Sequence, residues 1–412
     1  MRKLISILLL VIMVIPGLAK AESTLNVAFI RDGYLWTLMN GKEEKITTKA
    51  AIYHYDPQWS PDGKWILYQI EPKENTNVDF QNEIWVYSLE TKQHKRITPD
   101  GANPKWSPVE NIVAFKSGRV LNVSNLDTFY NIALGVDDYA WFPDGKSFIG
   151  SSSASLHPDG WTNPKLYKIE LNKDFDSVTS LTEGVKPLYT IPSEIKKGDV
   201  NLLAINASDF HFSPDAQWIS FIVSPTASWS MDSNLVGVIS ADGKMFEAID
   251  EIILHLDSPK WAPKKNLLGY ISGGGRIVLG FKEKDMTITE MPAFKSMNLT
   301  PASFAELGFS WRDDDSLVVS RVKESEWSND PAKRPNPSLY LIKMGEPMQI
   351  QISHPPKGYG DYQPTYIKAI KKLTWVRKKH LTDSSQNLWM ADADGKNAQV
   401  WLERISGYDF YF

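Results

Sequence analysis

Short apolar runs alternate with polar turns along most of the chain, and many of them follow the same motif. In the clearest copy, Trp59 precedes the turn sequence Ser-Pro-Asp-Gly-Lys at residues 60–64, and the apolar run Trp-Ile-Leu-Tyr follows at residues 65–68. Similar copies recur downstream, the last two being weaker. Their aromatic anchors are Trp59, Trp106, Trp141, Phe212, Trp261, Trp311 and Tyr366. Alternating runs joined by Asp-Gly turns are typical of antiparallel β-hairpins.

A second hairpin lies between consecutive anchors. Residues 83–88 and 95–98 form one example, and residues 387–391 and 399–402 form another. Each unit therefore predicts four antiparallel strands, which we name a, b, c and d in chain order, with the anchor on strand a. A four-stranded unit that recurs at roughly 40–50 residues indicates a blade of a β-propeller. We expect the anchor tryptophans to pack between blades.

The two ends of the chain indicate how the blades close into a ring. Residues 25–30, 34–38 and 44–47 have the pattern of strands b, c and d, with no strand a before them. Residues 408–412 resemble residues 55–59, so we expect the C-terminus to supply the missing strand a and to leave no open sheet edge. The anchors and this shared blade predict a single all-β propeller of eight blades. Because two anchors are weak, seven blades is the alternative.

The first residues have the pattern of an export signal. A basic start precedes an apolar run at residues 4–15, and Ala-Lys-Ala occupies residues 19–21. We interpret residues 1–21 as a cleavable signal peptide and residues 22–412 as the propeller. A membrane anchor is the alternative, but a spanning helix needs roughly 20 apolar residues. We therefore expect an extracellular, cell-wall-associated or periplasmic protein with no transmembrane segment in the mature chain.

Composition excludes several classes of site and partner. The sequence contains no cysteine, and 45 Lys and Arg residues stand against 49 Asp and Glu residues. Without cysteine there is no disulfide framework, thiolate metal ligand or cysteine nucleophile. The slightly acidic balance argues against nucleic acid as the main partner. We expect a monomer without a cofactor.

The repeat around Trp59 and its degenerate copies resemble the WD40-like repeats of TolB-type β-propellers, and also those of the propeller domains of prolyl-oligopeptidase-like enzymes. The resemblance extends over nearly the whole mature chain. It implies a propeller that binds proteins, peptides or saccharides, although the fold hosts many unrelated activities. TolB has a small N-terminal domain and six blades. Here the repeats begin almost at the predicted cleavage site, so the chain resembles an exported member that lacks this domain.

One candidate binding site lies on the face that carries the b–c and d–a loops, where the longest insertions fall. Three b–c loops contain a tryptophan outside the repeat pattern, and these are Trp161, Trp229 and Trp327. A loop tryptophan can stack on a sugar or anchor a peptide, and loops on a rigid scaffold often carry function. The alternative is that each of them folds back to cap its own blade.

A second candidate site lies at the start of strand a, near the expected central channel. The residues concerned are Asp56, Asp138, Asp209, Asp409, His54 and His211. Carboxylates around a channel mouth can collect a cation or a basic side chain. The arrangement also resembles propeller lyases acting on oligogalacturonate, which hold a metal with channel histidines. The alternative is that each Asp caps its own turn, and whether a metal binds stays open.

Recognisable catalytic motifs are missing. The sequence has no Gly-x-Ser-x-Gly elbow, no His-Glu-x-x-His pair and no phosphate-binding Gly-rich loop. We therefore predict no catalytic residue. The leading hypothesis is an exported, non-enzymatic propeller that binds a protein, peptide or saccharide on its long-loop face. The alternative is a propeller lyase or hydrolase that acts on extracellular glycans through channel Asp and His residues, with a divalent metal.

Overall fold

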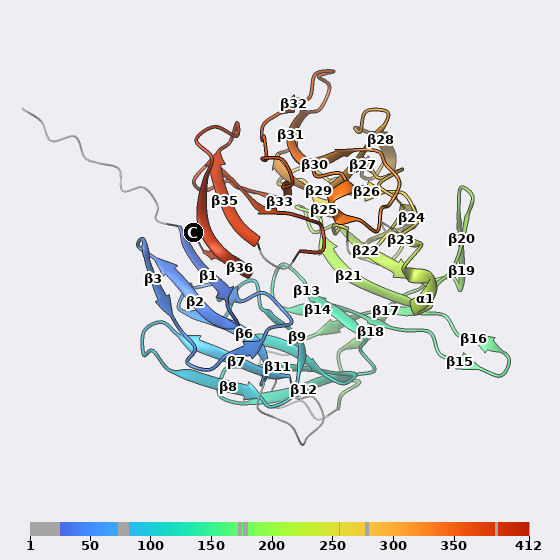
Figure 1. Ribbon diagram of the computed structural model, residues 1–412. Helices are drawn as coiled ribbons and strands as arrows, with labels where there is room; N and C mark the ends of the chain where they lie inside the picture. The colour runs from blue at the N-terminus through green and yellow to red at the C-terminus, as the bar shows by residue number, and fades with distance from the viewer. Residues whose placement is uncertain are drawn as a thin grey trace, which may run out of the picture.

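The computed structural model describes residues 25–72, 82–171, 175, 180–254, 256–276, 280–383 and 386–411 (Figure 1). The predicted signal peptide lies outside these residues. Nearly all of the regular structure is antiparallel β-sheet, as the hydrophobic pattern predicts. Within the described residues, no helix combines the length and the apolar character that a membrane crossing requires.

The sheets follow one another along the chain, each with four strands in the order a, b, c, d, and we name each by its first strand. The β5 sheet contains β5 (Gln58–Trp59), β6 (Trp65–Pro72), β7 (Glu83–Ser88) and β8 (His94–Thr98), with β4 (Ala51–Ile52) paired to β6. The β9 sheet contains β9 (Ala102–Trp106), β10 (Val113–Ser117), β11 (Val120–Ser124) and β12 (Phe129–Leu134). The β13 sheet contains β13 (Asp138–Trp141), β14 (Ser147–Ser152), β17 (Lys165–Glu170) and β18 (Val185–Thr190).

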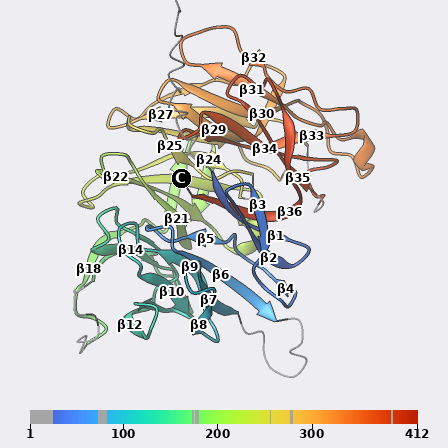
Figure 2. The same ribbon diagram turned by 90° about the vertical axis from the view of Figure 1, so that its left-hand side faces the viewer.

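The second half of the chain repeats this plan. The β21 sheet contains β21 (Asn206–Phe212), β22 (Trp218–Ser224), β23 (Asn234–Ser240) and β24 (Phe246–Ile252). The β25 sheet contains β25 (Lys260–Trp261), β26 (Leu267–Ser272), β27 (Asp285–Glu290) and β28 (Lys295–Asn298). The β29 sheet contains β29 (Phe304–Asp313), β30 (Ser316–Lys323), β31 (Ser338–Lys343) and β32 (Ile350–Gln351). In Figure 2 the β9, β21 and β29 sheets lie in succession from the bottom of the view to the top.

The two ends of the chain meet in one sheet. β33 (Gly360–Ile367), β34 (Lys372–Lys378), β35 (Gln386–Asp392) and β36 (Gln399–Tyr411) continue through β36 into β1 (Asn26–Arg31), β2 (Tyr34–Met39) and β3 (Lys42–Lys45). The first part of β36 pairs with β35 and its last part pairs with β1, with Phe410 opposite Val27. Figure 2 shows the blue β1–β3 beside the red β36.

The pairing corrects one detail of the predicted alignment at the C-terminus. Phe410 opposite Val27 corresponds to Trp59 opposite Ile66, so Asp409 takes the position of Gln58 and not that of Asp56. Aromatic residues occupy every second position from Tyr408 through Phe410 to Phe412, and a shift by two positions keeps the same residues on the same face of the strand. The sequence pattern alone could not distinguish the two registers.

The anchor tryptophans join neighbouring sheets, which confirms their expected packing role. In each case the indole Nε1 donates a hydrogen bond to a carbonyl of the preceding strand a. The pairs are Trp59 to Asp409 (3.2 Å), Trp106 to Gln58 (3.1 Å), Trp141 to Lys105 (3.4 Å), Trp261 to His211 (3.1 Å) and Trp311 to Lys260 (2.8 Å). In these five pairs the acceptor is the residue before the preceding anchor position, so one repeated contact joins neighbouring sheets at five junctions.

Smaller elements lie outside the four-stranded sheets. Two hairpins, β15 (Leu156–His157) with β16 (Gly160–Trp161) and β19 (Glu194–Lys197) with β20 (Val200–Leu203), project from the sheets on the right of Figure 1. A single turn of helix, α1 (Ala227–Ser230), and a 3₁₀ turn (Pro331–Lys333) lie in b–c loops. The b–c and d–a loops share one face because adjacent strands run antiparallel.

Candidate functional site

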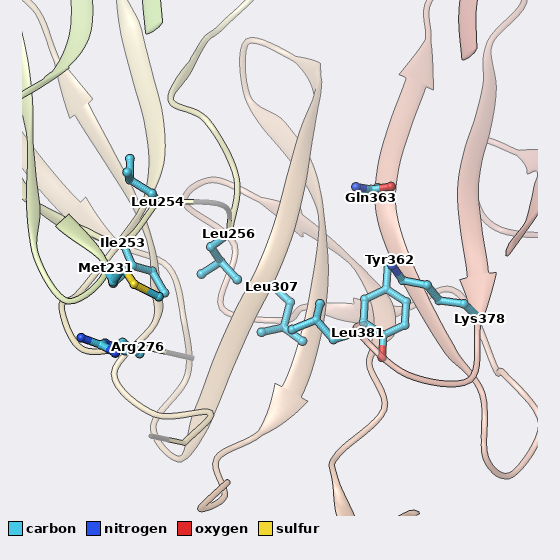
Figure 3. A pocket seen from close by; sticks show the side chains of 10 residues that line it. All are labelled: Met231, Ile253, Leu254, Leu256, Arg276, Leu307, Tyr362, Gln363, Lys378 and Leu381. Carbon is cyan, nitrogen blue, oxygen red and sulfur yellow. The ribbon is translucent and has the colours of Figure 1, made fainter. Parts of the chain in front are cut away.

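A pocket of about 300 Å³ opens on the face that carries the b–c and d–a loops. Its wall is mostly aliphatic, and the rim carries two cations and one amide (Figure 3). The lining residues are Met231, Ile253, Leu254, Leu256, Arg276, Leu307, Tyr362, Gln363, Lys378 and Leu381. Ligand sites commonly combine an apolar wall with a few polar groups, and their volumes start at about this size.

Four neighbouring sheets contribute to this pocket. Met231 follows α1, and Leu254 and Leu256 follow β24, so one wall comes from loops of the β21 sheet. Arg276 lies in the b–c loop of the β25 sheet. Leu307 on β29 completes the set together with side chains from β33 and the loop after β34. The site depends on how these sheets are placed relative to one another, and therefore on the tryptophan contacts between them.

The pocket rests on a packed apolar cluster. Phe281, Ala305 and Val322 are buried together with the pocket residues Leu307 and Tyr362. Partly buried side chains, including that of Trp327, pack against this cluster. Close packing of this kind holds a pocket in one shape, because side chains in a dense core have little room to move.

Two buried ion pairs lie directly behind the wall. Glu306 precedes Leu307, and its Oε1 accepts hydrogen bonds from the Arg321 guanidinium at 2.7 Å (Nε) and 2.5 Å (Nη2). Asp361 precedes Tyr362 and accepts from Arg377 Nε at 2.6 Å. Because successive side chains of a strand point to opposite faces, the acids face the interior while Leu307 and Tyr362 face the pocket.

Burial and the neighbouring arginine act in opposite directions on Glu306. Burial raises the pKa of Glu306, and the Arg321 charge and its hydrogen bonds lower it; burial dominates, so the pKa lies above the usual range of a glutamate. The second carboxylate oxygen of Glu306 has no hydrogen-bond partner within the described residues. This carboxylate therefore depends strongly on its single arginine partner.

The two cations at the rim differ in their surroundings. Arg276 is paired with Asp232, with Nε–Oδ1 and Nη2–Oδ2 distances of 2.5 and 3.0 Å. The Lys378 ammonium lies 5.2 Å from the centre of the Tyr362 ring, and no carboxylate of the described residues lies within ion-pair distance of it. Burial lowers the pKa of Lys378, and Asp383 opposes this through a longer-range attraction. Figure 3 shows Arg276 and Lys378 on opposite sides of the pocket.

None of the three predicted loop tryptophans lines this pocket. Trp327 stacks on Phe281 with a distance of 5.9 Å between ring centres, and the Arg334 guanidinium lies 3.8 Å above the Trp327 ring. Phe281 lies in the b–c loop of the neighbouring β25 sheet, so Trp327 packs between two sheets and does not simply cap its own blade, and binding by Trp327 stays a prediction. Trp229 in α1 is 62% exposed, and Trp161 lies half-buried in β16 opposite Leu156. Binding by Trp161 and Trp229 stays a prediction.

The predicted acidic residues do not gather at one point. Asp138 and Asp209 line a polar cavity of about 450 Å³ together with Lys105 and Lys116. Asp138 accepts hydrogen bonds at 2.8 Å from the Asn103 side chain and from the Asp209 backbone N–H. Asp138 therefore links adjacent strands a, in addition to lining the cavity.

Asp209 is paired with a histidine. The His211 Nε2 contacts Asp209 Oδ1 at 2.9 Å. Burial raises the pKa of Asp209, but the hydrogen bonds with His211 and Ser258 and the charges of His211 and Lys105 together outweigh it and hold this pKa below the usual range. Both residues are thus engaged with each other at the channel end of their strand.

Asp56 belongs to a different group. It does not line the polar cavity, and it faces the Asp409 carboxylate of the C-terminal strand. Burial and then the Asp409 charge raise the pKa of Asp56 to about 6. His54 pairs instead with Glu71, with a distance of 2.9 Å between Nε2 and Oε2. Among the described residues, no three His, Asp or Glu side chains are grouped as metal ligands.

The sequence reasoning missed the apolar pocket. It considered tryptophans and carboxylates, whereas the pocket is built from leucines in a d–a loop and from strand-a positions on two sheets. A signal was present, because residues 252–254 form an apolar run that continues past the end of β24, and Leu256 follows shortly after. An apolar run in a loop indicates either burial or a binding surface.

Comparisons with known proteins place the chain by fold. No protein-family model matches it. The uncharacterized peptidase YuxL of Bacillus subtilis (strain 168) is 25% identical over 202 residues, which are 42% of this chain and 30% of YuxL. A solved eukaryotic initiation factor is 12% identical, with a TM-score of 0.59 over 93% of this chain and 87% of that chain.

A puromycin-hydrolyzing peptidase of Mycobacterium tuberculosis is 13% identical, with a TM-score of 0.52 over 85% of this chain. This chain covers 53% of that peptidase, so it spans about half of the solved relative and less of YuxL. TolB of Acinetobacter baumannii is 12% identical with a TM-score of 0.38, which is too low to support the TolB-type family. With the succession of four-stranded sheets, these likenesses show a β-propeller fold.

Proposed function

We propose that this protein is a non-enzymatic binding protein whose long-loop face holds an apolar side chain of a protein or peptide partner. The observation that carries the proposal is the aliphatic pocket, with Leu254, Leu256 and Leu307 in its wall. An anchor side chain that enters a preformed pocket is the usual centre of a peptide or protein interface.

The chemistry of the wall favours a peptide over a saccharide. A sugar presents several hydroxyl groups that each need a hydrogen-bond partner once they are buried. The pocket offers mainly aliphatic carbon, and no loop tryptophan lines it. The name of YuxL, an uncharacterized peptidase, supports the same class of ligand.

The proposal includes the scaffold that carries the pocket. We infer a single ring of eight blades over residues 22–412, closed where β36 joins β1, with the last part of β36 as strand a of the first blade. The repeated tryptophan contacts between sheets support this arrangement. The basic start and apolar run of residues 1–21 support export through a signal peptide, and the ring is expected to act as a monomer.

The test blocks the pocket and compares the variant with a matched control. Met231 at the pocket and Met245 in the c–d turn of the same sheet are both exposed, at 57% and 49%. Met231→Trp fills the pocket, whereas Met245→Trp makes the same substitution on the opposite face of the protein, away from the pocket. A soluble pool of random heptapeptides, half with free C-terminal carboxylates and half with amides, is incubated with each protein, and retained peptides are identified by mass spectrometry.

We expect the wild-type protein and Met245→Trp to retain the same peptides, enriched in one apolar position. Met231→Trp should lose them while its melting temperature stays unchanged. Retention of the same peptides by Met231→Trp would place binding elsewhere and refute the proposal.

A further inference from the structure

The pocket joins an apolar wall to a positive charge that the protein does not neutralise at close range. Arg276 contributes no net charge to the rim, because Asp232 holds both sides of its guanidinium. Within the described part of the chain, the Lys378 ammonium has the Tyr362 ring and the more distant Asp383 charge to stabilise it. The rim therefore carries an excess positive charge on the Lys378 side.

This charge has a cost that a suitable ligand would remove. Lys378 lies half-buried at the end of β34, so its ammonium has lost part of its hydration without gaining an ion-pair partner. An anionic group placed beside it restores the lost interaction, and charge-assisted hydrogen bonds are stronger than neutral ones. The same anion must be joined to an apolar group that fits the leucine wall.

We propose that the pocket holds the C-terminal residue of a polypeptide, with its apolar side chain against Leu254 and Leu307 and its α-carboxylate on Lys378. This inference rests on the proposed function. A C-terminal residue carries a carboxylate and a side chain on the same carbon, whereas an internal residue offers only a neutral carbonyl. Capture of a terminal carboxylate is a known mode of peptide recognition.

A free aliphatic acid shares this chemistry, and the competitor in the test below distinguishes it from a chain end. At about 300 Å³ the pocket lies at the lower limit of small-molecule sites and is large enough for a terminal residue with its carboxylate. The rest of a peptide can leave the pocket through its open side and run along the loops.

The test uses fluorescein-labelled hexapeptides of the sequence Gly-Ser-Gly-Ser-Gly-X, with X as Leu, Met, Val or Phe. Each is made as the free acid and as the C-terminal amide, and binding is measured by fluorescence anisotropy with the full-length protein. Lys378→Gln is compared with Lys368→Gln, which changes an exposed lysine in the a–b turn of the same sheet, on the opposite face. 4-Methylpentanoate serves as a competitor without a peptide backbone.

We expect at least one free acid to bind about 10- to 100-fold more tightly than its amide, which is the usual contribution of a hydrogen bond to a charged group. Lys378→Gln should remove this preference for the acid over the amide, while Lys368→Gln should leave it in place. 4-Methylpentanoate should compete only at much higher concentration than the peptide.

The other outcomes separate the two proposals. Equal binding of acid and amide, lost in Met231→Trp, would overturn the C-terminal inference and leave the peptide-binding function in place. Competition by 4-methylpentanoate as strong as that of the peptide would overturn the inference in favour of a small carboxylate. Absence of binding by every peptide, terminal or internal, would overturn both.

Discussion

Glu306 and Arg321 are almost fully removed from water behind the wall of the pocket, with exposed fractions of 0% and 2% for their side chains. Arg321→Met removes the positive partner and keeps a side chain of similar length. The Glu306 carboxylate then lies buried without a counter-charge, and Thr300 is its remaining hydrogen-bond donor. Breaking one partner of a buried pair typically costs about 3–5 kcal/mol, and we expect a loss of this size in the free energy of unfolding at pH 7.5.

The assay is urea unfolding followed by tryptophan fluorescence at pH 7.5 and pH 5. Burial raises the pKa of Glu306 in the folded state, and without Arg321 this pKa rises further. The folded variant therefore binds a proton that the unfolded chain releases, so its stability is highest at low pH and falls as pH rises through the interval between the two pKa values. We therefore expect the free energy of unfolding of Arg321→Met to lie closer to that of the wild type at pH 5 than at pH 7.5.

Two further variants complete this test. Glu306→Gln combined with Arg321→Met removes both charges and should recover much of the loss at pH 7.5. Lys197→Met breaks an exposed pair with Glu247, whose N–O distance is 3.3 Å, and should change stability by less than about 1 kcal/mol. The reasoning would be refuted if Arg321→Met lowered the free energy of unfolding no more than Lys197→Met does. It would also be refuted if the decrease in Arg321→Met did not depend on pH.

Three other predictions concern contacts between and within the sheets. Trp311→Phe removes the indole hydrogen bond to the preceding sheet and should lower the free energy of unfolding by about 1–2 kcal/mol, measured by urea unfolding. Asp56→Asn should raise the melting temperature at pH 7.5 but not at pH 4.5, because the raised pKa of Asp56 makes its ionised form unfavourable only at the higher pH. Trp327→Ala should destabilise by about 2 kcal/mol, whereas Trp229→Ala should stay within about 0.5 kcal/mol in the same assay.

The sequence predicts the sheets well because the determinants of each hairpin are local. An anchor such as Trp59, its Asp-Gly turn and the apolar run after it lie within a few residues of one another. Their periodicity and turn chemistry are therefore visible without any knowledge of distant contacts. The predicted register of Asp409 is wrong because the actual register depends on how the C-terminal strand pairs with Val27 and Ala28, at the other end of the chain.

The site was harder to predict because its parts lie on separate sheets. Leu254, Leu307 and Lys378 are far apart in sequence, and no local pattern indicates that they line one cavity. Whether a loop tryptophan is exposed or buried also depends on residues that are far away in the sequence. Trp327 and Trp229 lie in similar polar loops. Trp327 packs on Phe281, whereas Trp229 is exposed, and this difference comes from tertiary contacts that the loop sequences do not reveal.

The most direct test of the central claim is a crystal structure of the protein with the hexapeptide that binds most tightly. The account predicts the terminal side chain between Leu254 and Leu307, with the carboxylate within hydrogen-bond distance of Lys378 Nζ. A peptide bound instead in the polar cavity beside Asp138 and Asp209, with the leucine-lined pocket empty, would contradict it.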